Sequence, residues 1–210
     1  WNGVIGAIEL RAGGFVYIDD LQIYPDPARK TARVRVALGN AAGRVAQGRL
    51  RVQAQLTHPR QGEALPPKVV DYRAQPGATA LEIEYPMGEN PLLWDEFSPN
   101  VYTLTASLTG DSSDRRQADF GMRRMGVEGT QFTINGRKTF IRGTLECCIF
   151  PLTGYPPTDV ESWLRILQIA KAHGLNQLRF HSWCPPEAAF IAGDRMGFMY
   201  QVECCVWTAV

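Results

Sequence analysis

The sequence lacks both a long apolar run and an excess of charge of one sign. No apolar stretch reaches the ~18 residues that a membrane-spanning helix needs. Lysine plus arginine number 22 against 21 for aspartate plus glutamate, a formal net charge of +1. The chain therefore has no broad positive electrostatic field that would attract a phosphate backbone or an acidic membrane surface. Basic residues also do not cluster with interleaved aromatic ones. We expect neither a nucleic acid nor a membrane as a partner.

Cysteine is absent from the first two thirds of the chain. The five cysteines are Cys147, Cys148, Cys184, Cys204 and Cys205. Their number is odd, no pair has the spacing C-x-x-C, and no histidine stands near them at the spacing of a zinc site. A disulfide framework would be spread along the whole chain. The sequence therefore predicts small, buried side chains with free thiols. It predicts no metal site and no cofactor.

Both ends lack the signals that usually mark the start and the end of a protein. The chain begins at Trp1 without a methionine or a charged-then-apolar leader, and it stops at Val210 shortly after an apolar run. With 210 residues, 45% of them apolar, it can bury one full-sized core and part of a second. We expect an internal fragment of a longer protein. The compartment stays open, with a periplasmic or extracellular location favoured over a cytoplasmic one.

The first 122 residues read as strands. Short runs that alternate apolar and polar residues or are rich in β-branched ones are joined by turns containing Gly, Pro and Asn. No helical period occurs among them, so this part predicts an antiparallel β-sandwich with almost no helix. The runs are 16–18, 21–24, 33–38, 50–56, 69–70, 80–85 and 102–108.

The pattern changes near Gly126. Asn135-Gly136 lies between two β-prone runs, which predicts a hairpin because both turn positions favour positive φ. Thr158-Asp159-Val160-Glu161 has the form of a capping box with Thr158 as N-cap. An apolar period of three and four residues follows and ends at Gly174, which predicts a helix over 158–173.

Two further strands and a second helix complete the expected unit. The helix is predicted over 185–196 and ends at Gly197. The parallel strands are expected at 139–144, 176–181 and 198–203. Strand, helix, strand, helix, strand is the repeat of a parallel α/β unit. The sequence thus predicts two domains, the second one cut short.

Polar side chains collect where the expected parallel strands end. In a parallel α/β barrel, function gathers at the carboxyl ends of the strands. Two carboxylates, an arginine, a histidine and a tryptophan would meet there, a set that suits a polyhydroxylated ligand. The candidate substrate-binding residues are Glu146, Arg179, His181, Trp183 and Glu203.

Each candidate also has a plainer interpretation. Arg179 could pair with Glu203 or Glu146 as a structural brace. His181 could bind a backbone carbonyl, and Trp183 could be a packing plug in its loop. Only the coincidence of all five at three successive strand ends favours a binding site.

Several motifs resemble one known family. Phe120-Gly121-Met122-Arg123, Ile134-Asn135-Gly136-Arg137 and Phe140-Ile141-Arg142-Gly143 are similar to the entry into the catalytic barrel of family 2 glycoside hydrolases. That family includes β-galactosidases, β-glucuronidases and β-mannosidases. The segments 171–179 and 194–198 are similar to its next two blocks, and Val202-Glu203 stands where the family has Asp-Glu.

The resemblance implies a domain order for this chain. Residues 1–12 resemble the tail of the family's N-terminal sugar-binding-like domain. Residues 13–124 correspond to its immunoglobulin-like β-sandwich. Residues 125–210 correspond to the first part of its TIM (β/α)8 barrel.

The strand-end loops depart from the family pattern. His181 comes one place earlier than the family's histidine, and Cys147-Cys148 replace a His-Glu pair. In some β-galactosidases a glutamate of this region belongs to a magnesium site, but the neighbouring histidine is missing here, so no metal is expected. These departures imply a divergent subfamily.

The resemblance implies hydrolysis of β-linked sugars with retention and a carbohydrate as substrate. It leaves a homo-oligomer open as the assembly of the intact enzyme. The family's acid/base and nucleophile glutamates follow strands four and seven, so no catalytic residue is expected within this chain, and the chain alone is expected to be inactive. One alternative is a non-catalytic carbohydrate-binding relative, which would lack an Asn-Glu pair after strand four. Another is a barrel hydrolase acting through a cysteine, which the lack of a suitably spaced histidine disfavours.

Overall fold

The computed structural model describes residues 4, 6 and 8–204 of the chain. They divide into two compact units, described separately below. The sandwich unit comprises Leu10–Trp94 and Asn100–Met125, and the α/β unit comprises Asp95–Pro99 and the chain from Gly126 onward. Among the helices of the described part, none is both long and apolar enough to cross a membrane.

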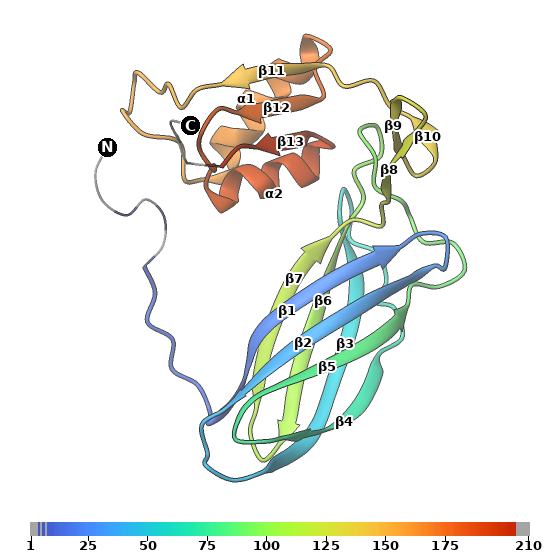
Figure 1. Cartoon of the computed structure of the whole chain (residues 1–210), viewed down its shortest axis with the longest axis vertical. Coiled ribbons are helices and arrows are strands. Elements are labelled where there is room, and N and C mark those ends of the chain that lie inside the picture. Colours follow the sequence, from blue (N-terminus) through green and yellow to red (C-terminus); the bar gives the residue numbers. More distant parts are fainter. Residues whose placement is uncertain (1–3, 5, 7, 205–210) are drawn as a thin grey trace. The chain divides into compact units, whose positions relative to one another are not determined.

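Two antiparallel sheets make up the sandwich unit (Figure 1). One has the strand order β1-β2-β5 and the other β4-β3-β6-β7. Residues 16–120 contain no helix, which confirms the prediction of an all-β unit. The strands are β1 Val16–Asp26, β2 Thr31–Asn40, β3 Ala46–His58, β4 Lys68–Ala74, β5 Gly77–Pro86, β6 Val101–Gly110 and β7 Asp114–Phe120.

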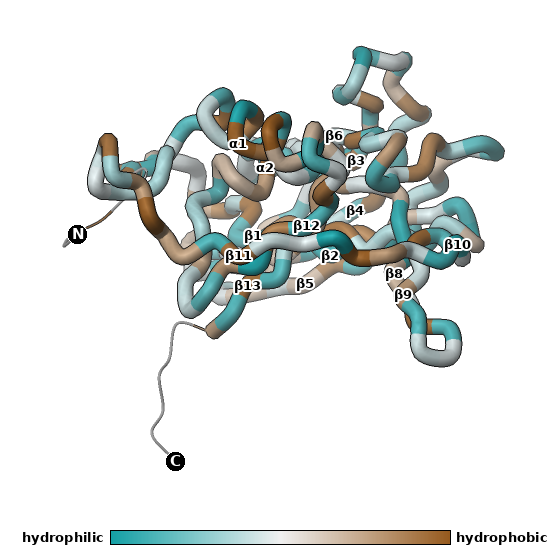
Figure 2. Tube along the Cα trace, turned by 90° about the horizontal axis from the view of Figure 1, so that it is seen from above, coloured by the Kyte–Doolittle hydropathy of each residue, from teal (hydrophilic) through white to brown (hydrophobic). Residues whose placement is uncertain are grey.

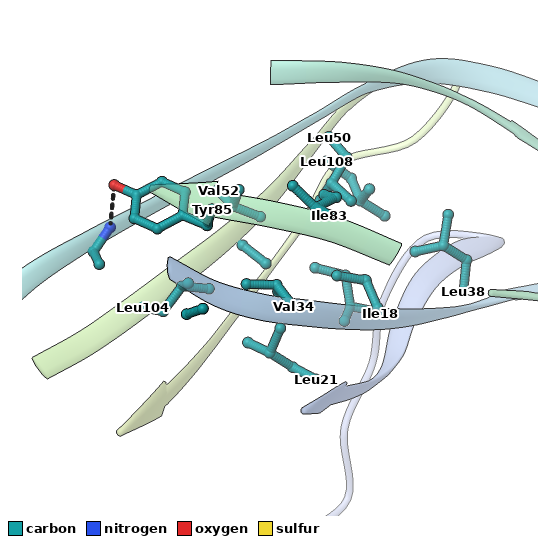
Figure 3. Packing of buried hydrophobic residues seen from close by; sticks show 14 of the residues in the cluster. Ile18, Leu21, Val34, Leu38, Leu50, Val52, Ile83, Tyr85, Leu104 and Leu108 are labelled. Atoms are coloured by element: carbon teal, nitrogen blue, oxygen red, sulfur yellow. Dashed lines mark hydrogen bonds between the residues drawn. The ribbon is translucent and has the colours of Figure 1, made fainter. Parts of the chain in front are cut away.

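The core lies between the alternating inner faces of these strands. Val34, Val36 and Leu38 of β2 are completely buried, as the period of two predicts. Side chains of β3 and β6 meet them from the other sheet (Figure 3). The buried Tyr85 keeps its hydroxyl paired there: it accepts from the Ala54 N–H at 3.1 Å and donates to the Pro66 carbonyl at 2.8 Å. The hydroxyl therefore avoids the cost of an unpaired buried polar group.

Strand β7 was not predicted from the sequence, and it stabilises a bulge in β1. The register of β1 shifts between Ile18 and Asp20. A bulge leaves backbone groups outside the ladder. Asp114 accepts from the Ile18 N–H at 2.7 Å, and Arg116 donates to the Ile18 carbonyl at 3.2 Å and also to the Asp19 carbonyl. The two short runs predicted at 16–18 and 21–24 are therefore one bulged strand.

The α/β unit contains a hairpin sheet, β10-β9-β8, and a parallel sheet, β11-β12-β13. Asn135 and Gly136 have φ of 53° and 76°, which confirms the predicted hairpin turn. The elements are β8 Met125–Glu128, β9 Gln131–Ile134, β10 Arg137–Lys138, β11 Gly143–Glu146, α1 Val160–Ala172, β12 Gln177–Phe180, α2 Glu187–Met196 and β13 Met199–Val202.

Helices α1 and α2 share a second core with the parallel sheet. Trp163 and Leu167 of α1 are fully buried, as are Phe180 of β12 and Ala189 and Ala192 of α2. Apolar and polar residues alternate along both helices in Figure 2. For α1 this is the amphipathic pattern from which the helix was predicted, whereas α2 was predicted from Pro185-Pro186 at its start and Gly197 at its end.

Both helices begin two residues later than predicted. Helix α1 begins at Val160 with Asp159, not Thr158, as its N-cap, because the Asp159 carboxylate accepts from the Ser162 N–H at 2.8 Å. Helix α2 begins at Glu187 after Pro186. It ends as predicted, with Gly197 in the left-handed conformation at φ 66°.

The strand predicted at 139–144 is also displaced, and lies at Gly143–Glu146. The backbone just before it is bound by Asn176, through both the side chain and the N–H of that residue. Asn176 accepts from the Arg142 N–H at 2.8 Å and donates to the Phe140 carbonyl at 3.0 Å. Pairing with β12 therefore starts at Gly143.

Glu96 anchors the segment Asp95–Pro99 within the α/β unit. Glu96 is 8% exposed, and its carboxylate accepts from Asn176 Nδ2 at 2.6 Å and from Arg142 Nη2 at 3.0 Å. Lys171 Nζ donates to the Glu96 carbonyl at 2.8 Å. Two cations and a buried amide thus compensate for the burial of this charge.

The prediction of buried cysteines is wrong for three of them. Cys147, Cys184 and Cys204 are exposed, and Cys148 is half-buried. All four have free thiols, as expected, whereas Cys205 lies outside the described residues. They follow strand ends, where the chain emerges into loops.

Candidate functional site

The three parallel strands bring their carboxyl ends to one edge. Glu146 of β11 is in register with Phe180 of β12, which is in register with Val202 of β13. Hydrogen bonds continue beyond the strands, from the His181 N–H to the Glu146 carbonyl at 2.9 Å and from the Glu203 N–H to the Phe180 carbonyl at 3.3 Å. All five candidate residues therefore lie in or directly after these strands.

Arg179 and Glu203 form an ion pair across β12 and β13. The Arg179 Nε donates to Glu203 Oε1 at 2.5 Å, and its Nη2 contacts the same oxygen. The Arg179 side chain is 50% exposed and that of Glu203 is 22% exposed. The hydrogen bond from Arg179, followed by the one from the Ser182 N–H, lowers the pKa of Glu203. This is the brace that the plainer interpretation of Arg179 anticipated.

Glu203 also holds the loop that follows β12. Its second oxygen, Oε2, accepts from the Ser182 N–H at 2.9 Å. Ser182 has φ 60°, a left-handed conformation that residues with a Cβ adopt rarely. Both oxygens of Glu203 thus have protein partners.

Glu146 has a similar role in the loop that follows β11. Its half-buried carboxylate accepts from the Cys148 N–H, with both oxygens at 3.0 Å from the nitrogen. Cys148 is left-handed as well, at φ 59°. Burial raises the pKa of Glu146, against the opposing effect of its backbone hydrogen bonds. Burial and the nearby Glu146 charge raise the pKa of Cys148 to about 11.

Trp183 packs beside this edge. Its indole N–H donates to the Glu146 carbonyl at 3.4 Å, and its ring meets Phe180 and Phe150 edge to face at 5.3 and 6.4 Å. Trp183 and His181 are both half-buried. The indole therefore belongs partly to the core, while each of the two side chains keeps some surface toward solvent.

Sequence reasoning missed Ser182 and Cys148, whose backbone amides engage the two carboxylates. A left-handed conformation is typical of glycine and asparagine, so neither residue signals it. Among the residues that the structure describes, no group of three or more His, Cys, Asp or Glu side chains could hold a metal ion.

Several solved structures that share this fold are glycoside hydrolases. Bacteroides uniformis beta-glucuronidase 2 covers 92% of this chain with a TM-score of 0.74 and 18% identity, and this chain covers 25% of it. A beta-galacturonidase from Eisenbergiella tayi covers 91% with a TM-score of 0.70 and 21% identity, with 33% of it covered. The fold is thus one found in glycoside hydrolases.

Sequence comparison identifies the family. The model for "Glycosyl hydrolases family 2" matches residues 16–123, just over half of the chain. This chain belongs to glycosyl hydrolase family 2. Beta-galactosidase BoGH2A of Bacteroides ovatus is 32% identical over 120 residues, 55% of this chain and 14% of that protein. Staphylococcus xylosus beta-galactosidase is 29% identical over 119 residues, 57% of this chain and 12% of that protein. The chain therefore matches only 12–14% of the length of these relatives.

Proposed function

We propose that this chain is an internal part of a retaining β-glycosidase. In this proposal the sandwich unit is the enzyme's immunoglobulin-like domain and β11–β13 are the first strands of its TIM (β/α)8 barrel. Family membership supports glycoside hydrolysis at the level of the family. The observation that carries the proposal is the β11-α1-β12-α2-β13 succession, with strands adjacent in chain order and with the candidate residues gathered at one edge.

The proposed substrate is a β-linked sugar that contacts the strand-end edge. Glu146, Arg179, His181, Trp183 and Glu203 stay the candidate residues of this edge. Half-buried side chains such as His181 and Trp183 could offer a polar group and an aromatic surface to a sugar ring. The bound sugar would lie against loops that the carboxylates hold in place.

The two catalytic carboxylates are proposed to lie outside this chain. Retention requires one carboxyl group to protonate the leaving oxygen and another to attack the anomeric carbon, ~5–5.5 Å apart. Glu203 binds Arg179 and the Ser182 N–H, whereas Glu146 binds the Cys148 N–H. Each of these two carboxylates thus has a structural role in its own strand-end loop.

A panel of nitrophenyl β-galactoside, β-glucuronide, β-mannoside and β-glucoside tests the proposal. We expect no turnover by the 210-residue chain and turnover of at least one substrate by the longer protein that contains it. Glu161→Gln, an exposed change in α1, is the matched control for Glu146→Gln and Glu203→Gln. Turnover by the 210-residue chain that is lost in either of the latter variants, but not in Glu161→Gln, would refute the assignment.

The exposed thiols offer a second test of where the sugar binds. Cys147, Cys184 and Cys204 follow the three strand ends, and each is exposed. A sugar bound at this edge should slow their alkylation by iodoacetamide, measured by mass spectrometry. Cys148 should react slowly with or without sugar, since its pKa is raised to about 11 and the thiolate is the reactive form.

A non-catalytic carbohydrate-binding protein is the second candidate function. The departures at Cys147 and His181 from the family pattern favour it, because both replace or shift residues at the strand ends. Protection of the thiols by sugar, together with no turnover by the longer protein, would support this candidate over the enzyme.

A further inference from the structure

The loop after β12 takes its shape from a side chain that comes 21 residues later. The Ser182 N–H donates to Glu203 Oε2 at 2.9 Å, while Ser182 has φ 60°. A left-handed serine is intrinsically unfavourable because its Cβ crowds the backbone carbonyl. The hydrogen bond from outside the loop therefore stabilises a conformation that serine adopts rarely.

Arg179 fixes the direction of that carboxylate. Its guanidinium holds Glu203 Oε1, which leaves Oε2 directed at the Ser182 amide. Arg179 is two residues before His181, in the strand that leads into the loop. The charge of Glu203 is thus satisfied by protein groups, and its 22% exposed side chain is oriented from two sides.

The neighbouring loop repeats the same arrangement. Glu146 ends β11, and its carboxylate accepts from the N–H of Cys148, a left-handed residue at φ 59°. Two adjacent strand ends thus each pair a carboxylate with the amide of a left-handed residue that is not glycine. This recurrence indicates that the carboxylates shape the loops.

We propose that Glu203 is a positioning residue: through Ser182 it sets where His181 and Trp183 stand at the strand-end edge, instead of binding the sugar itself. That this positioning serves sugar binding rests on the proposed function. The positioning itself can be measured without any sugar.

The first experiment follows Trp183 in the 210-residue chain labelled with 5-fluorotryptophan. Its fluorine resonance, assigned by its loss in Trp183→Phe, reports how the indole lies against Phe180 and Phe150. Glu203→Ala should shift or broaden this resonance. It should also speed hydrogen exchange of the Ser182 amide about tenfold or more, since a charge-assisted hydrogen bond is lost.

The rescue variant decides between positioning and direct binding. Glycine adopts positive φ at little cost, so Ser182→Gly in the Glu203→Ala background should return the Trp183 resonance toward the wild-type position. Cys148→Gly in the same background is the matched control, because it relieves the left-handed residue of the other loop, and it should not restore the signal. An unchanged resonance in Glu203→Ala, or a double variant no closer to wild type, would overturn the proposal.

Sugar binding separates this proposal from the proposed function. The four nitrophenyl glycosides are titrated into the wild-type chain, Glu203→Ala and Glu203→Ala/Ser182→Gly. Weaker binding in Glu203→Ala that recovers in the double variant supports positioning. Binding that stays weak while the Trp183 resonance recovers would make Glu203 a direct ligand and overturn it. Failure of every glycoside to bind the wild-type chain would count against the proposed function, and the resonance would still decide the role of Glu203 in the loop.

Discussion

Replacing Glu96 tests what holds the α/β unit together. Glu96 is 8% exposed, and its carboxylate accepts two hydrogen bonds, from Arg142 Nη2 and Asn176 Nδ2. Both bonds end on the same oxygen, Oε2, so Glu96→Ala removes the acceptor of both at once. The bond from Lys171 is unaffected, because it reaches the backbone carbonyl of Glu96.

The expected cost follows from the groups left behind. Removing one partner of a buried ion pair costs ~3–5 kcal/mol, because the remaining charge is uncompensated. Here the Arg142 side chain is 38% exposed and still donates to the Gly174 and Phe140 carbonyls, so water and backbone reduce that cost. Asn176 is 1% exposed and retains its bond to Phe140. We expect a loss of ~2–3 kcal/mol in the free energy of unfolding.

Urea unfolding of the 210-residue chain, followed through the fluorescence of tryptophan, measures this loss. Trp163 is buried in the α/β unit and reports its unfolding, and Trp163→Phe identifies its contribution. Arg137→Ala is the control within the same unit, since its pair with Asp95 spans 3.8 Å and the Arg137 side chain is 76% exposed. It should cost no more than ~0.5 kcal/mol. Equal costs for Glu96→Ala and Arg137→Ala would refute the claim that the buried cluster stabilises this unit.

Three further predictions concern single positions. Gly197→Ala should lower the free energy of unfolding by ~2 kcal/mol or more, because φ is 66° and a Cβ would lie 2.7 Å from a backbone oxygen. Gly129→Ala, with φ 60° and open space around the Cβ, should cost only ~1 kcal/mol. Equal shifts of the two melting temperatures would contradict this prediction. Because Asp159 is the N-cap of α1, Asp159→Ala should lower the free energy of unfolding by ~1 kcal/mol, and Thr158→Ala by much less. Urea titrations of both variants measure the difference. Burial raises the pKa of Glu146, so the folded state binds the Glu146 proton more tightly than the unfolded state does. The stability that this proton contributes is fully present below the unfolded pKa of ~4.3. It is lost as pH rises through the folded pKa. Stability measured from pH 4 to 7 should therefore fall with rising pH more in the wild type than in Glu146→Gln, and identical profiles would exclude this contribution.

Local pattern was sufficient for most of the secondary structure. Alternation along β2 and β3, the Asn135-Gly136 turn and the apolar period of α1 all depend on neighbours within a few residues, and the structure contains each of them. Strand β7 was missed because its sequence, from Asp114 to Phe120, is mostly charged or polar. It is a strand because its backbone pairs with β6 and its side chains complete the bulge in β1.

The candidate edge was predicted in position but not in detail. Strand ends can be located from periodicity, and all five candidate residues lie in or directly after the parallel strands. Which oxygen meets which donor depends on the register between strands that are more than 20 residues apart in the sequence. The pairing of Glu203 with the Ser182 amide could therefore not be anticipated.

The sequence by itself determined an all-β unit followed by an alternating α/β unit, because periods of two and of three to four residues are set by the geometry of one chain segment. Tertiary structure alone decided that Glu96, from a segment between β5 and β6, would be buried against Arg142 and Asn176. It also decided that Ser182 and Cys148 would be left-handed, because a distant carboxylate holds the first and a strand-end carboxylate the second. These outcomes rest on the desolvation of charged groups and on hydrogen bonds that exist only once the strands have paired.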